Sequence, residues 1–539
     1  MIARRSFLIL TTSSIVGIIG WIEFILIVKL WGGYAPEAIG IIAFTFSLMA
    51  TFNFSTDLGF GAAHVKRISE GKDLGTCIGT FATIKIILTC LMTIIVILTI
   101  NILKITSNEE FYNTTTEPII YLFLITNIIS NLLAIPITTF TGKKEFVKQV
   151  IPGFIGKIFQ LIFLTLVVIA GASAGNISPT IVWPSALQSL QQLIADNAME
   201  SIAVVYIISI TVNILIAMWL LRKYPFRRPS WVLFKSYFSF ALPLMFLPFI
   251  GAITGSIDKL LLGYYWSSVE IGYFFAMGMI VNFASVFPSA LSNVLFPTIS
   301  EFHSNKNFVK IKQSIQLAER YISMITVFLI IGVVVLAIPV IKIFMSDEFL
   351  IASPILFLLA ISSFIWCING PYQSLVKGMD KPRILLKITI VTALISVALN
   401  FLIIPKDGLL SPFGIQGPTG AAVTGVLTAL IWFFGLRIAA KKYAGLTILQ
   451  SHTPRHIIAS LGMGVVLYLL GFRTPFFSVI HWYHLIVLFG IGLIIYLGIL
   501  FLLKEFDKQD FDFFVNILRP KKMLKYVKSE LKDEMKKSK

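Results

Sequence analysis

Long apolar segments recur from one end of this 539-residue chain to the other. A helix needs about 20 mostly apolar residues to cross the hydrocarbon core of a bilayer, where no water is present to hydrogen-bond an open backbone. Hydrophobic residues make up 57% of the chain and charged residues 13%, whereas ordinary soluble domains carry about 25% charged residues. The sequence therefore predicts an all-α polytopic membrane protein.

The apolar segments predict fourteen spans. Their expected ranges are 7–31, 37–63, 74–103, 118–141, 150–174, 200–221, 236–262, 270–298, 313–341, 350–376, 384–404, 418–440, 455–472 and 482–503. We expect two six-helix lobes followed by a helix pair and a tail. The corresponding ranges are 1–222 for the N-terminal lobe, 223–440 for the C-terminal lobe, 441–503 for the extra pair and 504–539 for a basic amphipathic cytoplasmic tail.

The two predicted lobes repeat one another at a constant offset. An offset of 235 residues relates Glu23 to Asp258, Lys85 to Arg320, and Pro136 to Pro371. A repeat of this length in a membrane chain is typical of transporters whose substrate path lies between two lobes. Because each copy holds an even number of predicted spans, the copies should face the same way across the membrane.

The basic residues predict the orientation. Most of the 44 lysines and arginines, Arg437 among them, fall in the tail or in segments that are cytoplasmic if the N-terminus is cytoplasmic. By the positive-inside rule, both termini should then lie in the cytoplasm, with the protein in the cell (plasma) membrane. The net charge of +18 follows from this topology, and without a nucleic-acid-binding motif we expect no nucleic acid partner.

No motif for catalysis or nucleotide hydrolysis is present. The string that begins at Thr141 (Thr-Gly-Lys-Lys) lacks the leading glycine of a Walker A motif. We therefore expect no enzyme, no cofactor and no metal site, with transport driven by a gradient or potential such as coupled H⁺ or Na⁺. A membrane glycosyltransferase would need acidic residues on a large outer loop, and the longest such loop, about 175–199, offers Asp196.

Ionisable residues inside spans are costly in hydrocarbon and usually face a wet cavity or a partner. The candidate substrate-binding residues are Glu23, Asp57, Lys85, Lys157, Asp258 and Arg320. At about 1.5 Å of rise per residue, Lys85 and Lys157 lie about 10–17 Å along helices that begin at the cytoplasmic side. We expect these two lysines to form a basic patch for an anionic headgroup in the inner half of a central cleft.

Other interpretations compete for several of these residues. Lys259 and Arg320 could extend to the membrane interface instead. Asp57 could neutralise Lys66 and Arg67. Polar and aromatic residues on the candidate lumen helices could contact sugar hydroxyls or tie neighbouring helices together; these are Trp21, Asn53, Thr56, Asn127, Asn131, Asn282 and Asn293.

Two short motifs resemble a known family. The stretch from Asp57 to Arg67, Asp-Leu-Gly-Phe-Gly-Ala-Ala-His-Val-Lys-Arg, resembles the DLG…R signature of polysaccharide-exporting flippases, and Phe-Pro-Thr-Ile-Ser at 296–300 resembles their FPxxS. The order of these motifs and the predicted duplication of the spans extend the resemblance over most of the range 1–440. The chain resembles the multidrug/oligosaccharidyl-lipid/polysaccharide (MOP) superfamily, and within it the O-antigen (Wzx-type) flippases most.

The resemblance implies a V-shaped cavity between helices 1–6 and 7–12 that inverts by alternating access. It implies transport of a lipid-linked (polyprenyl-diphosphate) oligosaccharide to the outer leaflet, in polysaccharide or surface glycan biosynthesis. The extra helix pair would hold the lipid tail, and a glycan polymerase or glycosyltransferase would be the partner machinery. The alternative is a multidrug/cation antiporter of the same superfamily in which Glu23, Asp57 or Asp258 binds H⁺ or Na⁺.

Overall fold

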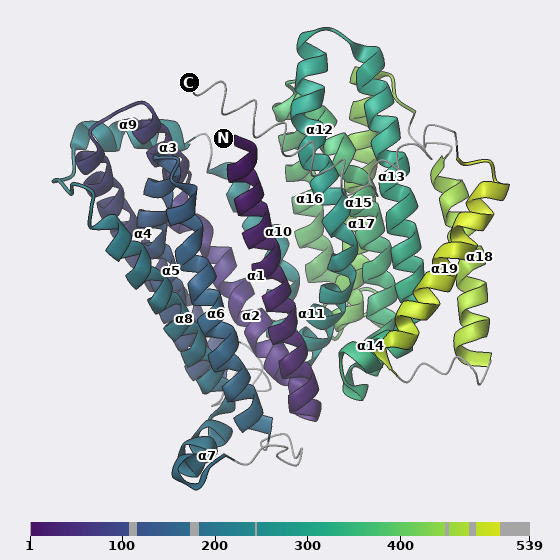
Figure 1. Ribbon diagram of the computed structural model, residues 1–539, viewed down its shortest axis with the longest axis horizontal. Helices are drawn as coiled ribbons and strands as arrows, with labels where there is room; N and C mark the ends of the chain where they lie inside the picture. Colours follow the sequence, from purple (N-terminus) through teal and green to yellow (C-terminus); the bar gives the residue numbers. More distant parts are fainter. Residues whose placement is uncertain are drawn as a thin grey trace. The chain divides into compact units, whose positions relative to one another are not determined.

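The computed structural model describes residues 2–106, 116–172, 183–242, 245–447, 452–473 and 481–506, and the regular elements in these ranges are all helical (Figure 1). Twelve helical segments in the described part of the chain are long and apolar enough to cross a membrane. One of them, Thr12–Asp57, covers the first two predicted spans. The prediction of an all-α polytopic membrane protein is confirmed, with twelve candidate spans in place of the fourteen expected.

The chain divides into two compact units between Ser268 and Val269. The helices of unit 1 are α1 (Ile2–Trp31), α2 (Ala35–Asp57), α3 (Phe60–Ser69), α4 (Leu74–Thr106), α5 (Thr116–Gly142), α6 (Phe146–Gly171), α7 (Gln188–Asp196), α8 (Ala198–Leu221), α9 (Trp231–Ala241) and α10 (Phe246–Tyr265). Helix α8 packs against α5 and α6, α1 against α6, and α2 against α10. The lobe boundary expected at residue 222 stays a prediction, but contacts group α9 and α10 with unit 1.

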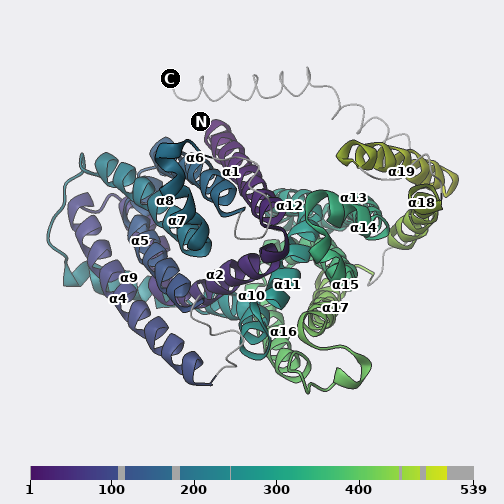
Figure 2. The same cartoon turned by 90° about the horizontal axis from the view of Figure 1, so that it is seen from below.

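Unit 2 is built around α15. Its helices are α11 (Ser268–Asn282), α12 (Val286–Ser304), α13 (Phe308–Val335), α14 (Ala337–Phe344), α15 (Ser353–Gly378), α16 (Pro382–Ile403), α17 (Gly417–Ala444), α18 (His452–Arg473) and α19 (Trp482–Leu502). Helix α15 packs against α12, α13 and α17, whereas α18 packs against α13 and α19 (Figure 2). The described part of the predicted tail ends at residue 506, so most of the range 504–539 lies outside the described residues.

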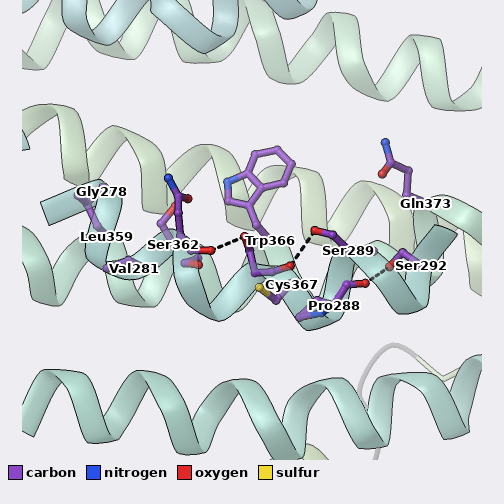
Figure 3. Close-up of a pocket in the computed structure, with 14 residues that line it drawn as sticks. Gly278, Val281, Pro288, Ser289, Ser292, Leu359, Ser362, Trp366, Cys367 and Gln373 are labelled. Carbon is purple, nitrogen blue, oxygen red and sulfur yellow. Dashed lines mark hydrogen bonds between the residues drawn. The ribbon is translucent and has the colours of Figure 1, made fainter. Parts of the chain in front are cut away.

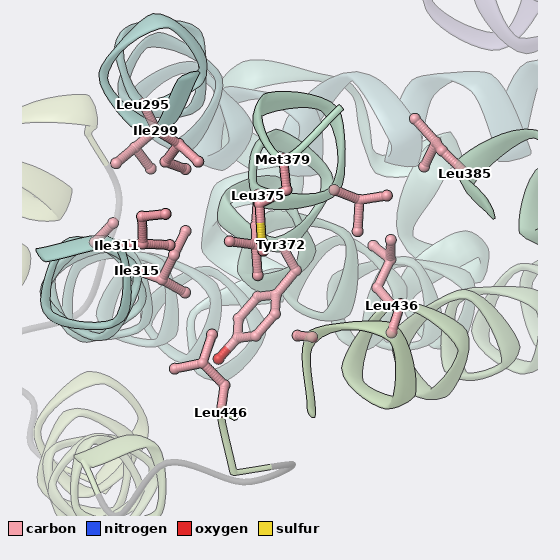
Figure 4. Packing of buried hydrophobic residues seen from close by; sticks show 14 of the residues in the cluster. Leu295, Ile299, Ile311, Ile315, Tyr372, Leu375, Met379, Leu385, Leu436 and Leu446 are labelled. Carbon is pink, nitrogen blue, oxygen red and sulfur yellow. The ribbon is translucent and has the colours of Figure 1, made fainter. Parts of the chain in front are cut away.

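Close helix approach holds the α12–α13–α15–α17 core together (Figure 4). Ile299 of α12, Ile315 of α13 and Leu436 of α17 are completely buried in it. Lipid tails are as apolar as these side chains, so tight packing rather than the hydrophobic effect stabilises such contacts. At Gly378 of α15 an added Cβ would lie 2.7 Å from Cγ2 of Ile299, so the absence of a side chain there permits the approach.

Two predicted spans are interrupted in the structure. The span expected at 236–262 is split into α9 and α10, and α9 ends two residues before Pro243 in the sequence. The span expected at 270–298 is split by a 3-10 turn, Phe283–Ser285, just before Pro288. Proline has no backbone N–H and its ring crowds the carbonyl four residues earlier, which accounts for the interruption before Pro288.

Candidate functional site

An ion pair inside unit 1 joins the predicted residues Glu23 and Lys157. The Lys157 Nζ lies 2.5 Å from Glu23 Oε2, and Gln160, one turn further along α6, donates to the same oxygen at 3.3 Å. The Glu23 side chain is 5% exposed and that of Lys157 is 18% exposed. A ligand approaching this pair would therefore meet the ammonium before the carboxylate.

In the pair formed by Lys85 and Asp57, the carboxylate is the more exposed group and the ammonium is buried. Lys85 is 3% exposed, donates to the backbone carbonyl of Thr56 at 2.9 Å and lies 3.7 Å from Asp57 Oδ1. This carbonyl belongs to the C-terminal turn of α2, where carbonyls lack intrahelical partners and a cation is favoured. Asp57 is 53% exposed, and its Oδ1 accepts from the backbone N–H of Gly61 at 3.0 Å in the first turn of α3. Lys85 thus secures the junction of α2 and α3, and the accessible group is the carboxylate.

The two lysines are held separately, by carboxylates of different helices. Lys85 contacts the Thr56 carbonyl and Asp57, whereas Lys157 contacts Glu23. The contacts do not favour the alternative in which Asp57 neutralises Lys66 and Arg67, because both of those residues pair with Glu70 and Asp57 lies beside Lys85. The predicted shared basic patch stays a prediction, with Lys157 its accessible member.

A chain of polar side chains ties α2 to α5. The hydroxyl of Thr56 donates to Asn131 Oδ1 at 2.7 Å, and the Asn131 amide donates to Asn53 Oδ1 at 3.2 Å and to Asn127 Oδ1 at 2.8 Å. These contacts favour the interpretation that the polar residues tie neighbouring helices together over the interpretation that they contact sugar hydroxyls.

Asp258 and Lys259 form a local pair on α10. Their side chains are 23% and 17% exposed, with Nζ 3.0 Å from Oδ1. Because the ammonium also donates to the carbonyl of Gly255 at 3.3 Å, Lys259 is held along its own helix.

Arg320 of α13 is bound to a buried carboxylate that follows α19. Its Nε donates to Glu505 Oε1 at 2.8 Å, and Glu505 also lies 2.6 Å from His452, 3.2 Å from Arg455 and 3.4 Å from His456. Burial alone would raise the pKa of Glu505, but its contacts with His456, Arg320 and the other neighbouring basic groups outweigh burial and bring the pKa to about 2. Arg320 therefore anchors the α18–α19 pair to α13.

Sequence reasoning missed a second buried ion pair, between Glu319 of α13 and Arg437 of α17. The two side chains are 2% and 1% exposed, and two arginine nitrogens donate to the two carboxylate oxygens at 2.7 and 3.0 Å. Tyr372 of α15 donates to Glu319 Oε2 at 2.5 Å and lies under the guanidinium, with Cζ 3.5 Å from the ring centroid. Both residues lie inside expected spans, 313–341 and 418–440, which is a signal for a buried partner, but the positive-inside count assigned Arg437 to a cytoplasmic segment.

A pocket of about 410 Å³ lies within unit 2, between α11, α12 and α15 (Figure 3). Its volume falls within the range of about 300–1,000 Å³ typical of ligand sites. None of the fourteen lining residues is charged. The polar side chains include Asn282, Ser285, Ser289, Ser292, Ser362 and Gln373, and the indole of Trp366 stands beside them. Of these residues, sequence reasoning had selected Asn282.

The sequence and the fold of this chain are both similar to those of known proteins. Residues 181–354 match the polysaccharide biosynthesis protein family. The fold is similar to the inward closed conformation of the lipid II flippase MurJ, with a TM-score of 0.66 and 17% identity over 92% of this chain and 98% of that one. The chain therefore shares the fold of this flippase.

Two further matches agree with this fold. An inward-facing multidrug resistance MATE family transporter of the MOP superfamily gives a TM-score of 0.52 and 14% identity, over 78% of this chain and 96% of that one. An uncharacterized membrane protein of Methanocaldococcus jannaschii, MJ1068, is 25% identical over 205 residues, which cover 38% of each chain. The resemblance to the MOP superfamily is confirmed.

Proposed function

We propose that this MOP-type transporter is a flippase for a lipid-linked oligosaccharide. It would move a polyprenyl-diphosphate glycan from the cytoplasmic to the outer leaflet of the cell membrane by alternating access, through a V-shaped cavity between its lobes. The match of residues 181–354 to the polysaccharide biosynthesis family supports the glycan part of this proposal. The topology that we propose has fourteen spans and both termini in the cytoplasm.

The Lys157–Glu23 pair carries the proposal. Lys157 is the twelfth residue of α6, so its Cα lies about 16 Å along a helix that begins on the proposed cytoplasmic side. Its ammonium is the more exposed member of the pair and acts as a point-charge donor for a phosphate oxygen. When a diphosphate binds, the ammonium would exchange a contact with Glu23 for one with the substrate, and Gln160 would continue to donate to the carboxylate.

Two observations favour a cation antiporter as a second candidate. Asp57 is 53% exposed, and the Oε1 atom of Glu23 has no hydrogen-bond partner among the described residues. Either carboxylate could take up H⁺ or Na⁺. The two candidates make opposite predictions for Glu23, because a flippase of the proposed kind needs the ammonium and an antiporter needs the carboxylate.

The first test is depletion of the protein in its native host. We expect lipid-linked oligosaccharide to accumulate on the cytoplasmic face of the membrane. Accumulation of a cationic dye with normal surface glycan would support the antiporter instead.

Substitutions at the pair then test the site. Glu23→Gln leaves the ammonium in place and should retain export, whereas Lys157→Met should abolish it. The double variant Glu23→Gln/Lys157→Met removes both charges, so no unpaired charge stays buried, and it should fold but fail to export. As a matched control, Lys104→Met breaks an exposed pair with Glu117 (Nζ to Oε2 2.8 Å) and should leave export unchanged. Normal surface glycan in the double variant would refute the assignment.

A further inference from the structure

The pocket of unit 2 lies at membrane depth and yet is lined by polar groups. Its lining residues on α15 run from Leu359 to Gln373, in a helix that extends from Ser353 to Gly378. At about 1.5 Å per residue they occupy the stretch from about 9 to 30 Å along the helix, which falls within the hydrocarbon core. Polar side chains at this depth usually tie helices together or line a substrate path. The open volume of the pocket favours the second role.

Three serines at the start of α12 and in the 3-10 turn before it show which chemistry the pocket offers. The hydroxyls of Ser285, Ser289 and Ser292 donate to backbone carbonyls of their own chain segment, at 2.7, 2.7 and 2.8 Å. A hydroxyl that donates in this way keeps its lone pairs as acceptors. This wall of the pocket therefore offers a row of acceptor oxygens, which suits a ligand rich in O–H and N–H donors.

Trp366 supplies an apolar surface beside these acceptors. Its side chain is 44% exposed, and its ring centroid lies 5.7 Å from that of Trp432, which is 6% exposed and supports the indole from behind. Aromatic faces pair with C–H surfaces as well as with cations. Because no lining residue carries a charge, neither an organic cation nor a phosphate would find a counter-ion here.

We infer that this pocket binds an uncharged sugar ring of the transported glycan. A sugar combines the two chemistries that the pocket accepts, with hydroxyl and amide donors around its edge and a C–H face for the indole. The inference rests on the proposed flippase function, and it assigns the sugar-binding site to this pocket of unit 2.

Gly278 of α11 provides a means of blocking the pocket. A Cβ added at this lining residue would meet no atom within 4 Å, so a large side chain there has room to enter the cavity. At Gly370, in contrast, an added Cβ would lie 2.3 Å from the Ser292 hydroxyl, so a substitution there would push α15 away from α12. Gly278→Phe is therefore the informative variant, and Gly278→Ala is its conservative control.

The experiment measures binding of two lipids to the purified full-length protein in nanodiscs. One probe is polyprenyl diphosphate bearing N-acetylglucosamine, and the other is bare polyprenyl diphosphate. We expect the wild type to bind the sugar-bearing lipid about tenfold more tightly, which corresponds to about 1.4 kcal/mol. Gly278→Phe and Trp366→Ala should bind both lipids with the affinity of the bare one. Gly278→Ala should retain the preference, as should Gly490→Phe, which adds the same side chain in open space on α19.

The possible results distinguish a failure of the sugar-site inference from a failure of the proposed flippase function. Equal binding of both lipids by the wild type would overturn the sugar site and leave the flippase proposal standing. A preference that survives in both Gly278→Phe and Trp366→Ala would do the same. If the wild type binds neither lipid, the proposed function fails and the inference fails with it.

Discussion

Removing Arg437 should destabilise unit 2 by several kcal/mol. In Arg437→Met, the 2%-exposed carboxylate of Glu319 loses two hydrogen bonds from the guanidinium and keeps the one from Tyr372. An uncompensated buried charge of this kind costs about 3–5 kcal/mol. The guanidinium also lies 3.5 Å from the Tyr372 ring centroid and 4.6 Å from that of Phe433. A desolvated cation–π contact contributes about 2 kcal/mol, part of which the methionine side chain replaces by packing.

Removing both charges should restore most of that stability. The double variant Arg437→Met/Glu319→Gln keeps an acceptor for the Tyr372 hydroxyl and leaves no charge buried. Replacing a buried ion pair by uncharged side chains is often close to neutral. We therefore expect the double variant to be at least about 2 kcal/mol more stable than Arg437→Met alone, which is within the range of couplings between contacting residues.

Equilibrium unfolding of the purified protein by SDS in mixed micelles, followed by near-UV circular dichroism, measures these differences. The exposed pair Lys342–Asp347 is the control, since its side chains are 52% and 75% exposed and its charged atoms 3.6 Å apart. Lys342→Met should change the stability by less than about 1 kcal/mol. Wild-type stability in Arg437→Met, or a double variant less stable than Arg437→Met, would show that the pair does not hold α13 to α17.

Two further predictions concern the helix junctions. The pKa of Glu505, about 2, lies below its ordinary value of 4.5, so its stabilising effect is complete above about pH 4.5 and is lost as the pH falls towards 2. Glu505→Gln should remove this dependence from the thermal unfolding midpoint measured across that range; an unchanged profile would contradict the assignment. Gly79→Ala would place a Cβ 1.9 Å from the backbone oxygen of Arg227 and should cost about 1–3 kcal/mol. Gly20→Ala, with no atom within 4 Å of its Cβ, should be neutral or stabilising in the same unfolding assay, and equal stability of the two variants would contradict the close approach of α4 to Arg227.

The sequence predicted the helices well because the signal for a span is local. An apolar run of sufficient length has no alternative in a bilayer, so nearly every expected span contains a described helix. The interruptions before Pro243 and Pro288 were harder to predict. Prolines are accommodated in many membrane helices, and whether one bends or ends a helix depends on neighbours that the sequence does not identify.

The pairing of the buried charges could not be predicted, because partners are distant in the chain. Depth along the helix selected Glu23 and Lys157, yet these residues are 134 positions apart and belong to helices that are not consecutive. Arg437 lies near the basic end of its span, where a residue at the cytoplasmic interface gives the same pattern. The pocket serines had no signal at all, since serine in a membrane helix is commonly a packing residue.

The predicted repeat relates two basic residues, Lys85 and Arg320, that make different contacts. Lys85 and Arg320 are related by the 235-residue offset, and each is a cation in the first half of its helix. Lys85 secures the end of α2 within its own copy, through the carbonyl of Thr56. Arg320 instead binds Glu505, which follows the extra pair α18–α19. Because Arg320 is paired with Glu505, it is poorly placed to bind substrate. A matching position in the predicted repeat therefore does not by itself identify a substrate-binding residue. The charge chemistry that we propose for transport therefore depends on Lys157, which has no ionisable counterpart in the second copy.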